Sequence, residues 1–236
     1  IAGIDVNMWC PAKKVVRSGH GSSLLINEET AFEIVRALNE ATHLPISVKT
    51  RLSFDWEQDL INFAKGLEKA GCSLLTIHGR TAKQAYTWKS NLEPLYELKK
   101  HISIPIIANG DVLNYDDGMK KVKNLDWFMI GRGSFGNPWC FLPWEQHPTL
   151  ANILDQMEFH AQKLVETKWE KKWNLEIRKH LVQYLKNFPW VKAYRKRLVT
   201  TESFENTQNV INEIRIEFKD DLNKKPSLGE IEKKED

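Results

Sequence analysis

The 236-residue sequence lacks long apolar runs and contains few cysteines and glycines. No stretch approaches the roughly 18 apolar residues that a membrane-spanning helix needs, and the N-terminal residues have no signal-peptide pattern. The three cysteines, Cys10, Cys72 and Cys140, are far apart and form no C-x-x-C pair. The sequence therefore predicts neither a disulfide framework nor a zinc site. We expect a cytoplasmic monomer that binds neither a membrane nor a metal.

Neither sign of charge dominates the whole chain, but one segment is strongly basic. The 34 Lys and Arg residues nearly balance 31 Asp and Glu residues, and 42% of the residues are hydrophobic, so the chain is of ordinary globular type. Between residues 171 and 197, nine Lys and Arg residues accompany a single acid, Glu176. Such a segment suits a polyphosphate partner, because neutralising phosphates releases counterions. A solvated basic helix face is an equally good interpretation.

Short strand-like runs alternate with helical runs over residues 1–143. This alternation is typical of parallel strands joined by crossover helices. It predicts an α/β fold, a partial (β/α)8 TIM barrel that contains the last five strands and lacks the N-terminal ones. We expect strands at 4–8, 45–49, 74–78, 105–109 and 127–130, and helices at 29–41, 58–70, 92–100 and 114–123.

Beyond residue 143 the strand signal stops and amphipathic helical patterns follow. They predict a small all-α helical bundle over residues 144–218. Residues 219–236 are charged and have few apolar anchors, so we expect a disordered tail. The domain prediction is thus a barrel domain at 1–143, a helical domain at 144–218 and a tail at 219–236.

Several short motifs carry a family resemblance. They are Asp5–Pro11, Gly19–Leu25, Val48–Arg51, His78–Thr81, Ala108–Val112, Met129–Gly133 and Gly136–Trp139. In order and spacing they resemble the tRNA-dihydrouridine synthases. The resemblance implies FMN-dependent reduction of the C5–C6 bond of specific tRNA uridines, with NADPH or NADH as the reductant.

The predicted reaction needs an acid beside the pyrimidine ring. Hydride transfer to C6 of uracil builds negative charge toward C5 and O4, so C5 has to be protonated, and a thiol can do this. Cys10 follows a strand end and precedes Pro11, which makes it the candidate proton donor. A small buried apolar role is the better interpretation of Cys72 and Cys140.

The remaining strand ends supply candidate FMN-binding residues. Lys49 would place an ammonium group near the electron-rich pyrimidine portion of the flavin, and His78 would donate to the flavin or its phosphate. Two glycine-containing loops resemble the phosphate loops after the last two barrel strands. The implied cofactor-binding residues are Lys49, His78, Asn109, Gly110, Asp111, Gly131 and Arg132.

The same resemblance assigns a second group of residues to tRNA. A uridine has to leave its stack to reach the flavin, so a domain that grips the surrounding RNA is needed. The candidate RNA-binding residues are Arg80 and, in the basic helical segment, Arg178, Lys179, His180, Tyr184 and Arg195.

Four tryptophans, Trp9, Trp88, Trp127 and Trp190, stand where the family has glycine, in a chain with 9 Trp and only 12 Gly. Our hypothesis is that UGA codons, read as Gly in the source organism, appear here as Trp. Trp173 is a possible fifth case, whereas Trp139 matches the family. UGG codons at the four positions would contradict the hypothesis.

Two other functions stay open from the sequence. One is another FMN-dependent TIM-barrel oxidoreductase, acting on a free pyrimidine or dihydroorotate. The other is an inactive RNA-binding remnant in which a genuine Trp9 obstructs the active site.

Overall fold

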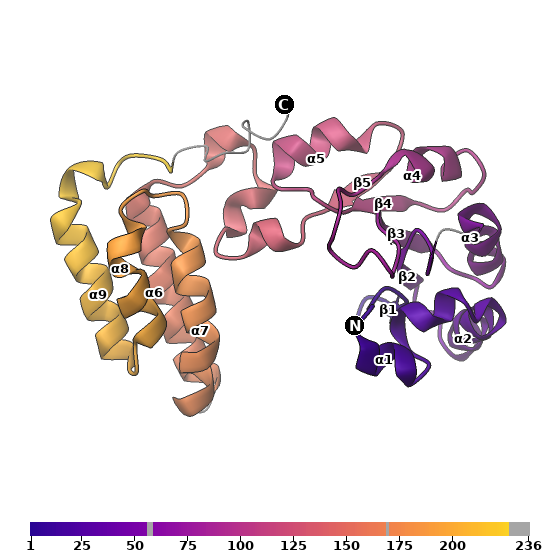
Figure 1. Cartoon of the computed structure of the whole chain (residues 1–236), viewed down its shortest axis with the longest axis horizontal. Coiled ribbons are helices and arrows are strands. Elements are labelled where there is room, and N and C mark those ends of the chain that lie inside the picture. The colour runs from indigo at the N-terminus through magenta and orange to yellow at the C-terminus, as the bar shows by residue number, and fades with distance from the viewer. Residues whose placement is uncertain (56–58, 169, 227–236) are drawn as a thin grey trace. The chain divides into compact units, whose positions relative to one another are not determined.

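A computed structural model describes residues 1–55, 59–168 and 170–226, and Figure 1 labels the helices and strands. The chain divides into two compact units, Ile1–Gly131 and Arg132–Asp236, which we describe separately. Within the described residues, no helix is both long enough and apolar enough to cross a membrane.

The first unit contains a five-stranded parallel sheet whose strand order follows the chain. The register pairs Asn7 with Lys49, Arg51 with His78, and His78 with Asn109, so these residues share one edge of the sheet. The predicted strands are confirmed. They are β1 (Ile4–Asn7), β2 (Ile46–Arg51), β3 (Leu74–His78), β4 (Ile106–Asn109) and β5 (Trp127–Met129).

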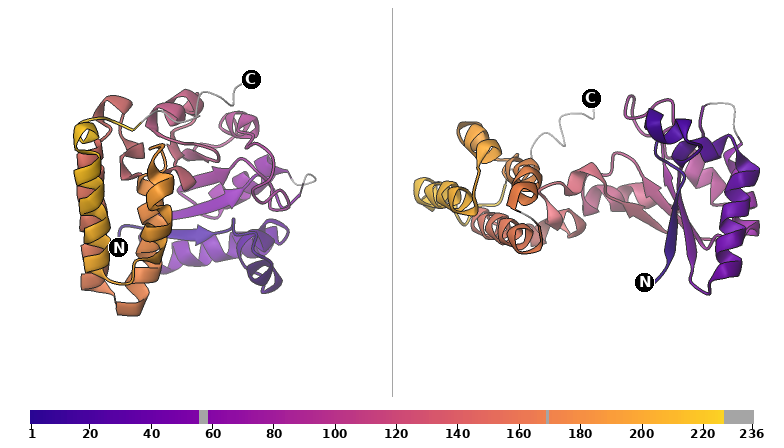
Figure 2. Two further views of the ribbon diagram at one scale, coloured as in Figure 1. Left: turned by 60° about the vertical axis from the view of Figure 1, so that its left-hand side comes forward. Right: turned by 90° about the horizontal axis from the view of Figure 1, so that it is seen from below.

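Helices connect these strands, and α2, α3 and α4 pack side by side in chain order (Figure 2). Two of these helices begin with a side-chain N-cap. The Asp59 carboxylate accepts from the N–H groups of Ile61 and Asn62, and the Asn114 side chain accepts from the N–H of Asp117. The predicted helices are confirmed as α2 (Glu28–Ala41), α3 (Leu60–Lys69), α4 (Glu93–Leu98) and α5 (Tyr115–Val122). The arrangement is that of a partial (β/α)8 barrel.

The loop after β1 contains local structure that the sequence analysis did not predict. A short helix α1 (Lys13–Arg17) and a 3₁₀ helix η1 (Gly21–Leu25) follow the strand. Gly21 has φ +60°, and a Cβ at this position would lie 2.8 Å from the carbonyl oxygen of Cys10. Glycine is therefore required where the chain packs back against the Cys10 loop.

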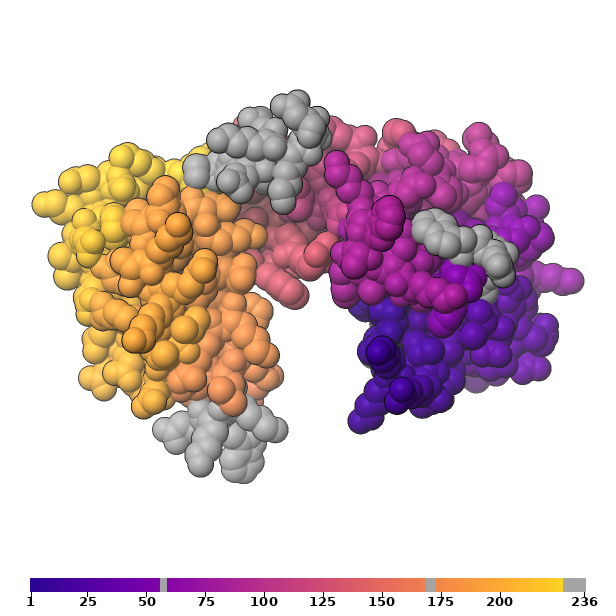
Figure 3. Space-filling view, in the orientation of Figure 1, coloured from indigo at the N-terminus to yellow at the C-terminus, as the bar shows by residue number. Residues whose placement is uncertain are grey.

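The second unit is a small helical bundle, as predicted, preceded by the 3₁₀ helices η2 (Arg132–Ser134), η3 (Pro138–Phe141) and η4 (Trp144–Gln146). Side chains fill the spaces between the helices (Figure 3), and Leu154, Met157, Leu181 and Ile211 are fully buried. The α-helices among its described residues are α6 (Leu150–Thr167), α7 (Glu170–Tyr184), α8 (Val191–Thr200) and α9 (Phe204–Glu217).

The unit boundary lies at residues 131 and 132, before the predicted boundary at 143. The segment between them packs on the helices: the ring centroid of Phe135 lies 6.3 Å from that of His180, and that of Trp139 lies 6.4 Å from that of Tyr184. Sequence periodicity could not reveal this, because the segment forms 3₁₀ helices rather than an amphipathic element.

The predicted disordered tail differs from the structure in its first part. Residues Lys219–Asp221 form the 3₁₀ helix η5, and Leu222 packs against the helical core. The carbonyl groups of Leu222 and Lys224 accept hydrogen bonds of 2.9 Å from the N–H groups of Ala151 and Leu150. The segment therefore satisfies donors at the start of α6, which composition alone does not reveal. Residues 227–236 of the predicted tail lie outside the described residues.

Candidate active site at the strand ends

Hydrogen bonds from both sides hold the Cys10 loop. The side-chain oxygen of Asn7, the last residue of β1, accepts from the N–H groups of Trp9 and Cys10 at 3.2 Å each. On the other side, the N–H of Ser22 donates to the carbonyl oxygen of Cys10 at 3.1 Å. The Cys10 side chain is partly exposed at the end of the first strand. A ligand at this edge of the sheet could therefore approach the thiol.

Lys49 and the side-chain amide of Asn109 link the ends of strands β2, β4 and β5. Its Nζ donates to Asn109 Oδ1 at 3.0 Å, and Asn109 Nδ2 donates to the carbonyl oxygen of Met129 at 3.1 Å. Burial, followed by the positive charge of Arg51, lowers the pKa of Lys49 to about 8. The predicted cofactor residues Lys49 and Asn109 are thus in direct contact.

Arg51 is a site residue that the sequence analysis missed. Its side chain is fully buried, with Nε donating to the carbonyl oxygen of Trp9 at 2.9 Å and Nη1 donating to those of Thr81 and Ala85 at 2.9 and 3.0 Å. Within the described part of the chain, the buried Nη2 has no hydrogen-bond partner.

Such an unpaired buried donor is costly and points to a ligand acceptor. Position offered a signal: Arg51 stands two residues after Lys49, and side chains at this spacing project from the same face of a strand.

His78 is a neutral donor in this arrangement. Burial, assisted by the positive charges of Arg51, Lys49 and Arg80, lowers its pKa to about 3. His78 Nε2 lies 3.3 Å from Arg80 Nη1, which can only donate, so we assign the ring proton to Nδ1. That buried Nδ1 also has no partner among residues 1–55, 59–168 and 170–226. The N–H is therefore available to a bound group.

Arg80 does not suit its predicted role as an RNA contact. The side chain is 3% exposed, and Nη2 donates at 2.6 Å both to Asp111 Oδ2 and to the carbonyl oxygen of Trp88. The same Asp111 oxygen accepts from the N–H of Ser90 at 2.9 Å. Arg80 and Asp111 thus connect two loops. The predicted cofactor residue Asp111 would affect a bound cofactor through its ion pair with Arg80. Sequence showed a basic residue beside His78 but not the loop that covers it.

The predicted phosphate loops differ in how much room they leave. Gly110 has φ +124°, and a Cβ there would lie 2.2 Å from Ser90 Oγ. Around Gly131, by contrast, an added Cβ would meet no described atom within 4 Å. Arg132 follows Gly131 directly, is exposed, and belongs to the second unit. Open backbone at Gly131 suits the approach of an anionic group.

The tryptophans at family glycine positions have different environments. The ring centroid of Trp9 lies 4.4 Å from Lys49 Nζ, against the amine expected to face the flavin. Trp88 is 80% exposed and has φ +67°, a conformation that favours glycine. Trp190 stacks on Phe218 with ring centroids 4.0 Å apart, and Trp173 is buried in the helical core. Only Trp88 among these has a backbone that itself favours glycine, and the codon hypothesis stays a prediction.

The predicted RNA-binding residues of the helical unit fall into two groups. Lys179 and Arg195 are exposed. Arg178 instead donates from Nε and Nη2 to the carbonyl oxygen of Thr201 at 2.8 and 2.5 Å. Tyr184 is buried, and its hydroxyl lies 3.1 Å from Nδ1 of His160, whose ring centroid is 5.0 Å from that of the partly buried His180. Arg178 and Tyr184 thus serve the packing of the bundle.

The model of one protein family, dihydrouridine synthase (Dus), matches residues 1–223. The chain belongs to the dihydrouridine synthase family. Curated relatives include probable tRNA-dihydrouridine synthase 1 of Synechocystis, 34% identical over 89% of this chain and 62% of the relative. A probable tRNA-dihydrouridine synthase of Rhizobium leguminosarum is 35% identical over 78% of this chain and 60% of the relative. The chain thus spans about three fifths of the length of these dihydrouridine synthases.

Proposed function

We propose that this chain is the part of a tRNA-dihydrouridine synthase that carries the proton donor, much of the flavin site and the helical RNA-binding domain. The reaction is FMN-dependent reduction of the C5–C6 bond of specific tRNA uridines with NADPH or NADH as the reductant. The observation that carries the proposal is the cluster of Lys49, Arg51 and His78 at the strand ends of a chain that matches the family over residues 1–223.

The donors of this cluster fit the polar edge of a flavin. Arg51 Nη2 and His78 Nδ1 are buried N–H donors without a partner in the described residues, and the Lys49 ammonium is held by Asn109. The pyrimidine portion of a flavin presents carbonyl and ring-nitrogen acceptors, to which such donors are complementary. For the phosphate we propose Gly110 and Gly131. FMN, when bound, supplies the hydride that reaches C6 of the uracil ring.

The chain's own residues supply the proton and the charge. Cys10 Sγ protonates C5, and the hydrogen bonds of Asn7 and Ser22 to its loop keep the backbone from moving as the proton leaves. The positive charges of Lys49 and Arg51 would favour negative charge on the pyrimidine portion of a bound flavin. In the helical unit, the exposed Lys179 and Arg195 contact phosphates of the tRNA.

The test is reduction of an unmodified tRNA transcript by the full chain supplied with FMN and NADPH, with dihydrouridine measured by mass spectrometry. Cys10→Ala should lower the rate by about 10²- to 10⁴-fold, the usual contribution of a general acid, while tRNA binding is unchanged. Cys72→Ala is the matched control, because burial raises the pKa of that thiol to about 11. Equal rates for Cys10→Ala and wild type would remove Cys10 from the mechanism.

One observation favours a second candidate, the inactive RNA-binding remnant. The Trp9 indole lies against Lys49 Nζ, where the flavin is proposed to bind. The remnant predicts that wild type binds tRNA but quenches no FMN fluorescence, and that Trp9→Gly restores flavin binding. If wild type binds FMN as tightly as Trp9→Gly, Trp9 does not close the site.

A further inference from the structure

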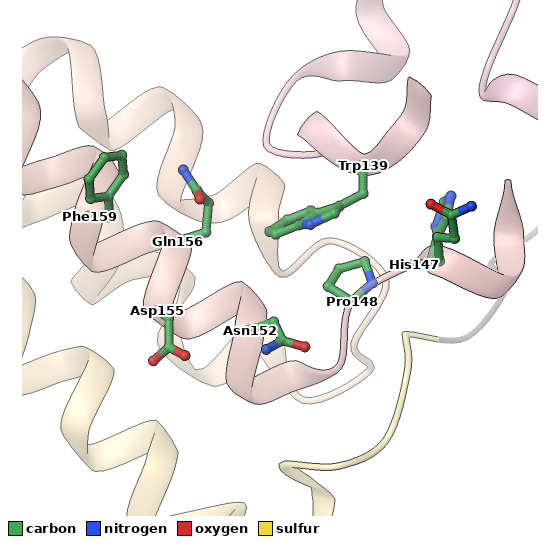
Figure 4. A pocket seen from close by; sticks show the side chains of 8 residues that line it. Trp139, His147, Pro148, Asn152, Asp155, Gln156 and Phe159 are labelled. Carbon is green, nitrogen blue, oxygen red and sulfur yellow. The ribbon is translucent and has the colours of Figure 1, made fainter. Parts of the chain in front are cut away.

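The helical unit contains a pocket that none of the proposed functions uses (Figure 4). Its volume is about 420 Å³, within the range of small-ligand sites. One wall is a face of α6, and the other comes from the segment of 3₁₀ helices that precedes it. The lining residues are Trp139, Gln146, His147, Pro148, Asn152, Asp155, Gln156 and Phe159.

The α6 wall is built by helical spacing. Asn152, Asp155, Gln156 and Phe159 stand three, four and seven residues apart, so they project from one face of the helix. The Trp139 indole extends toward this face from the opposite side (Figure 4). A planar ring therefore stands opposite a row of amide and carboxylate side chains.

Neighbouring contacts orient the two amides. The Gln156 amide makes a hydrogen bond with the Tyr184 hydroxyl. Asn152 Oδ1 accepts from the N–H of Thr149 at 3.2 Å and from its Oγ1 at 2.9 Å, which leaves the Asn152 amide nitrogen as a donor. Two amides are thus held beside an aromatic ring, and that of Asn152 presents a donor.

Charge argues for a neutral ligand. The lining contains the Asp155 carboxylate, which pairs with Arg215 at 2.7 Å, and includes no Lys or Arg among the described residues. Because Arg215 is already engaged by Asp155, no Lys or Arg of the described lining remains to hold a phosphate. A nucleobase combines a planar apolar face with donor and acceptor atoms at its edge.

We propose that this pocket binds an unpaired nucleobase of the RNA substrate, stacked on Trp139 and hydrogen-bonded by Asn152 and Gln156. The proposal rests on RNA being the substrate of this chain. It adds a base-binding site, separate from the reacting uridine, to a unit whose predicted RNA contacts are otherwise to phosphates. Because stacking accepts any base, the two amides decide which edge is preferred.

Titration of the ¹⁵N-labelled full chain with each of the four nucleoside 5′-monophosphates tests the pocket directly. The Trp139 indole N–H resonance, assigned with Trp139→Phe, should shift saturably with at least one nucleotide and not with ribose 5-phosphate. No shift, or an equal shift with ribose 5-phosphate, would overturn the proposal. This readout needs neither tRNA nor flavin.

Affinity for an unmodified tRNA transcript supplies the second readout. Trp139→Ala should weaken binding about 5-fold or more, the effect of losing one stacked base. Phe141→Ala is the matched control, because Phe141 is a 53% exposed ring in the same 3₁₀ helix and does not line the pocket. Gln156→Met keeps the side-chain volume and tests the amide should Trp139→Ala fail to fold.

The two readouts separate this proposal from the proposed function. Wild-type affinity in both Trp139→Ala and Gln156→Met would remove the pocket from RNA binding and leave the proposed function standing. If wild type itself fails to bind tRNA, the proposed RNA substrate is wrong, and the inference falls with it.

Discussion

Arg80 in the first unit and Arg195 in the second carry the same guanidinium group in opposite settings. Arg80 is 3% exposed and bonded to Asp111, His78 and the 87–88 backbone, whereas Arg195 is exposed on α8. A buried cation depends on its partners, because it has lost its water. An exposed cation leaves its charge available to a ligand. Both were assigned to RNA from sequence, and burial separates them.

The largest expected effect comes from replacing the buried arginine, Arg80. Arg80→Ala removes the ion pair to Asp111 and the donors to the loop carbonyls, so we expect the free energy of unfolding to fall by about 3 kcal/mol. Arg195→Ala should change it by less than about 0.5 kcal/mol. Urea denaturation of both variants measures the difference, and similar losses would mean that burial does not distinguish the two arginines.

Lys49 is expected to make a pH-dependent contribution to the free energy of unfolding. Its pKa in the folded chain, about 8, lies below the ordinary value of 10.5, so the unfolded chain binds the proton more tightly. Wild-type stability should therefore gain from the Lys49 contribution as the pH rises from about 8 to 10.5. Lys49→Met removes this contribution. Urea midpoints at several pH values should show the stability difference between wild type and Lys49→Met moving in favour of wild type as the pH rises. A constant difference would contradict the lowered pKa.

Removing backbone strain should have a smaller effect on stability, and this effect should be stabilising. Trp88 has φ +67° and an exposed ring, so Trp88→Gly should stabilise the chain by about 0.5–1 kcal/mol after the greater freedom of glycine in the unfolded chain is counted. Trp127 lies in β5 and stacks on Phe128, so Trp127→Gly should destabilise it. Thermal unfolding of both variants tests this, and a loss of stability in Trp88→Gly would show that the indole makes an offsetting contact.

The smallest effect compares two arginines of one helix. Arg195→Ala should reduce the slope of log Kd for tRNA against log salt by about 1, as expected for a lost phosphate contact. Arg197 forms a bidentate ion pair with Glu213, so Arg197→Ala should change the slope less. Binding measured at several salt concentrations decides between them. A wild-type slope in Arg195→Ala would place Arg195 outside the RNA contact.

Sequence predicted the strands and helices of the first unit because their hydrophobic periods are regular. Lys49 and Asn109 were recognised from strand-end motifs, and the structure joins them at 3.0 Å. The roles of Arg51 and Arg80 were not recognised. Both are fixed by carbonyl groups at positions 81–88, a loop without a periodic pattern.

In the helical unit, the sequence indicated the basic segment but not which cations are engaged. Arg178 donates to the carbonyl oxygen of Thr201, 23 positions along the chain, and no local pattern encodes such a contact. The pocket was missed for a similar reason. Trp139 comes from a 3₁₀ helix and its opposite wall from α6, so their approach is a property of tertiary packing.

The strand order of the sheet has a consequence for folding. Because β1 to β5 pair in chain order, each of β1 to β4 pairs with the strand that is synthesised next. The site is then assembled in stages: Lys49 is in place with β2, but its amide partner Asn109 arrives only with β4. Until β4 docks, the Lys49 ammonium therefore has water in place of the Asn109 oxygen, and this part of the site forms only when β4 joins the sheet.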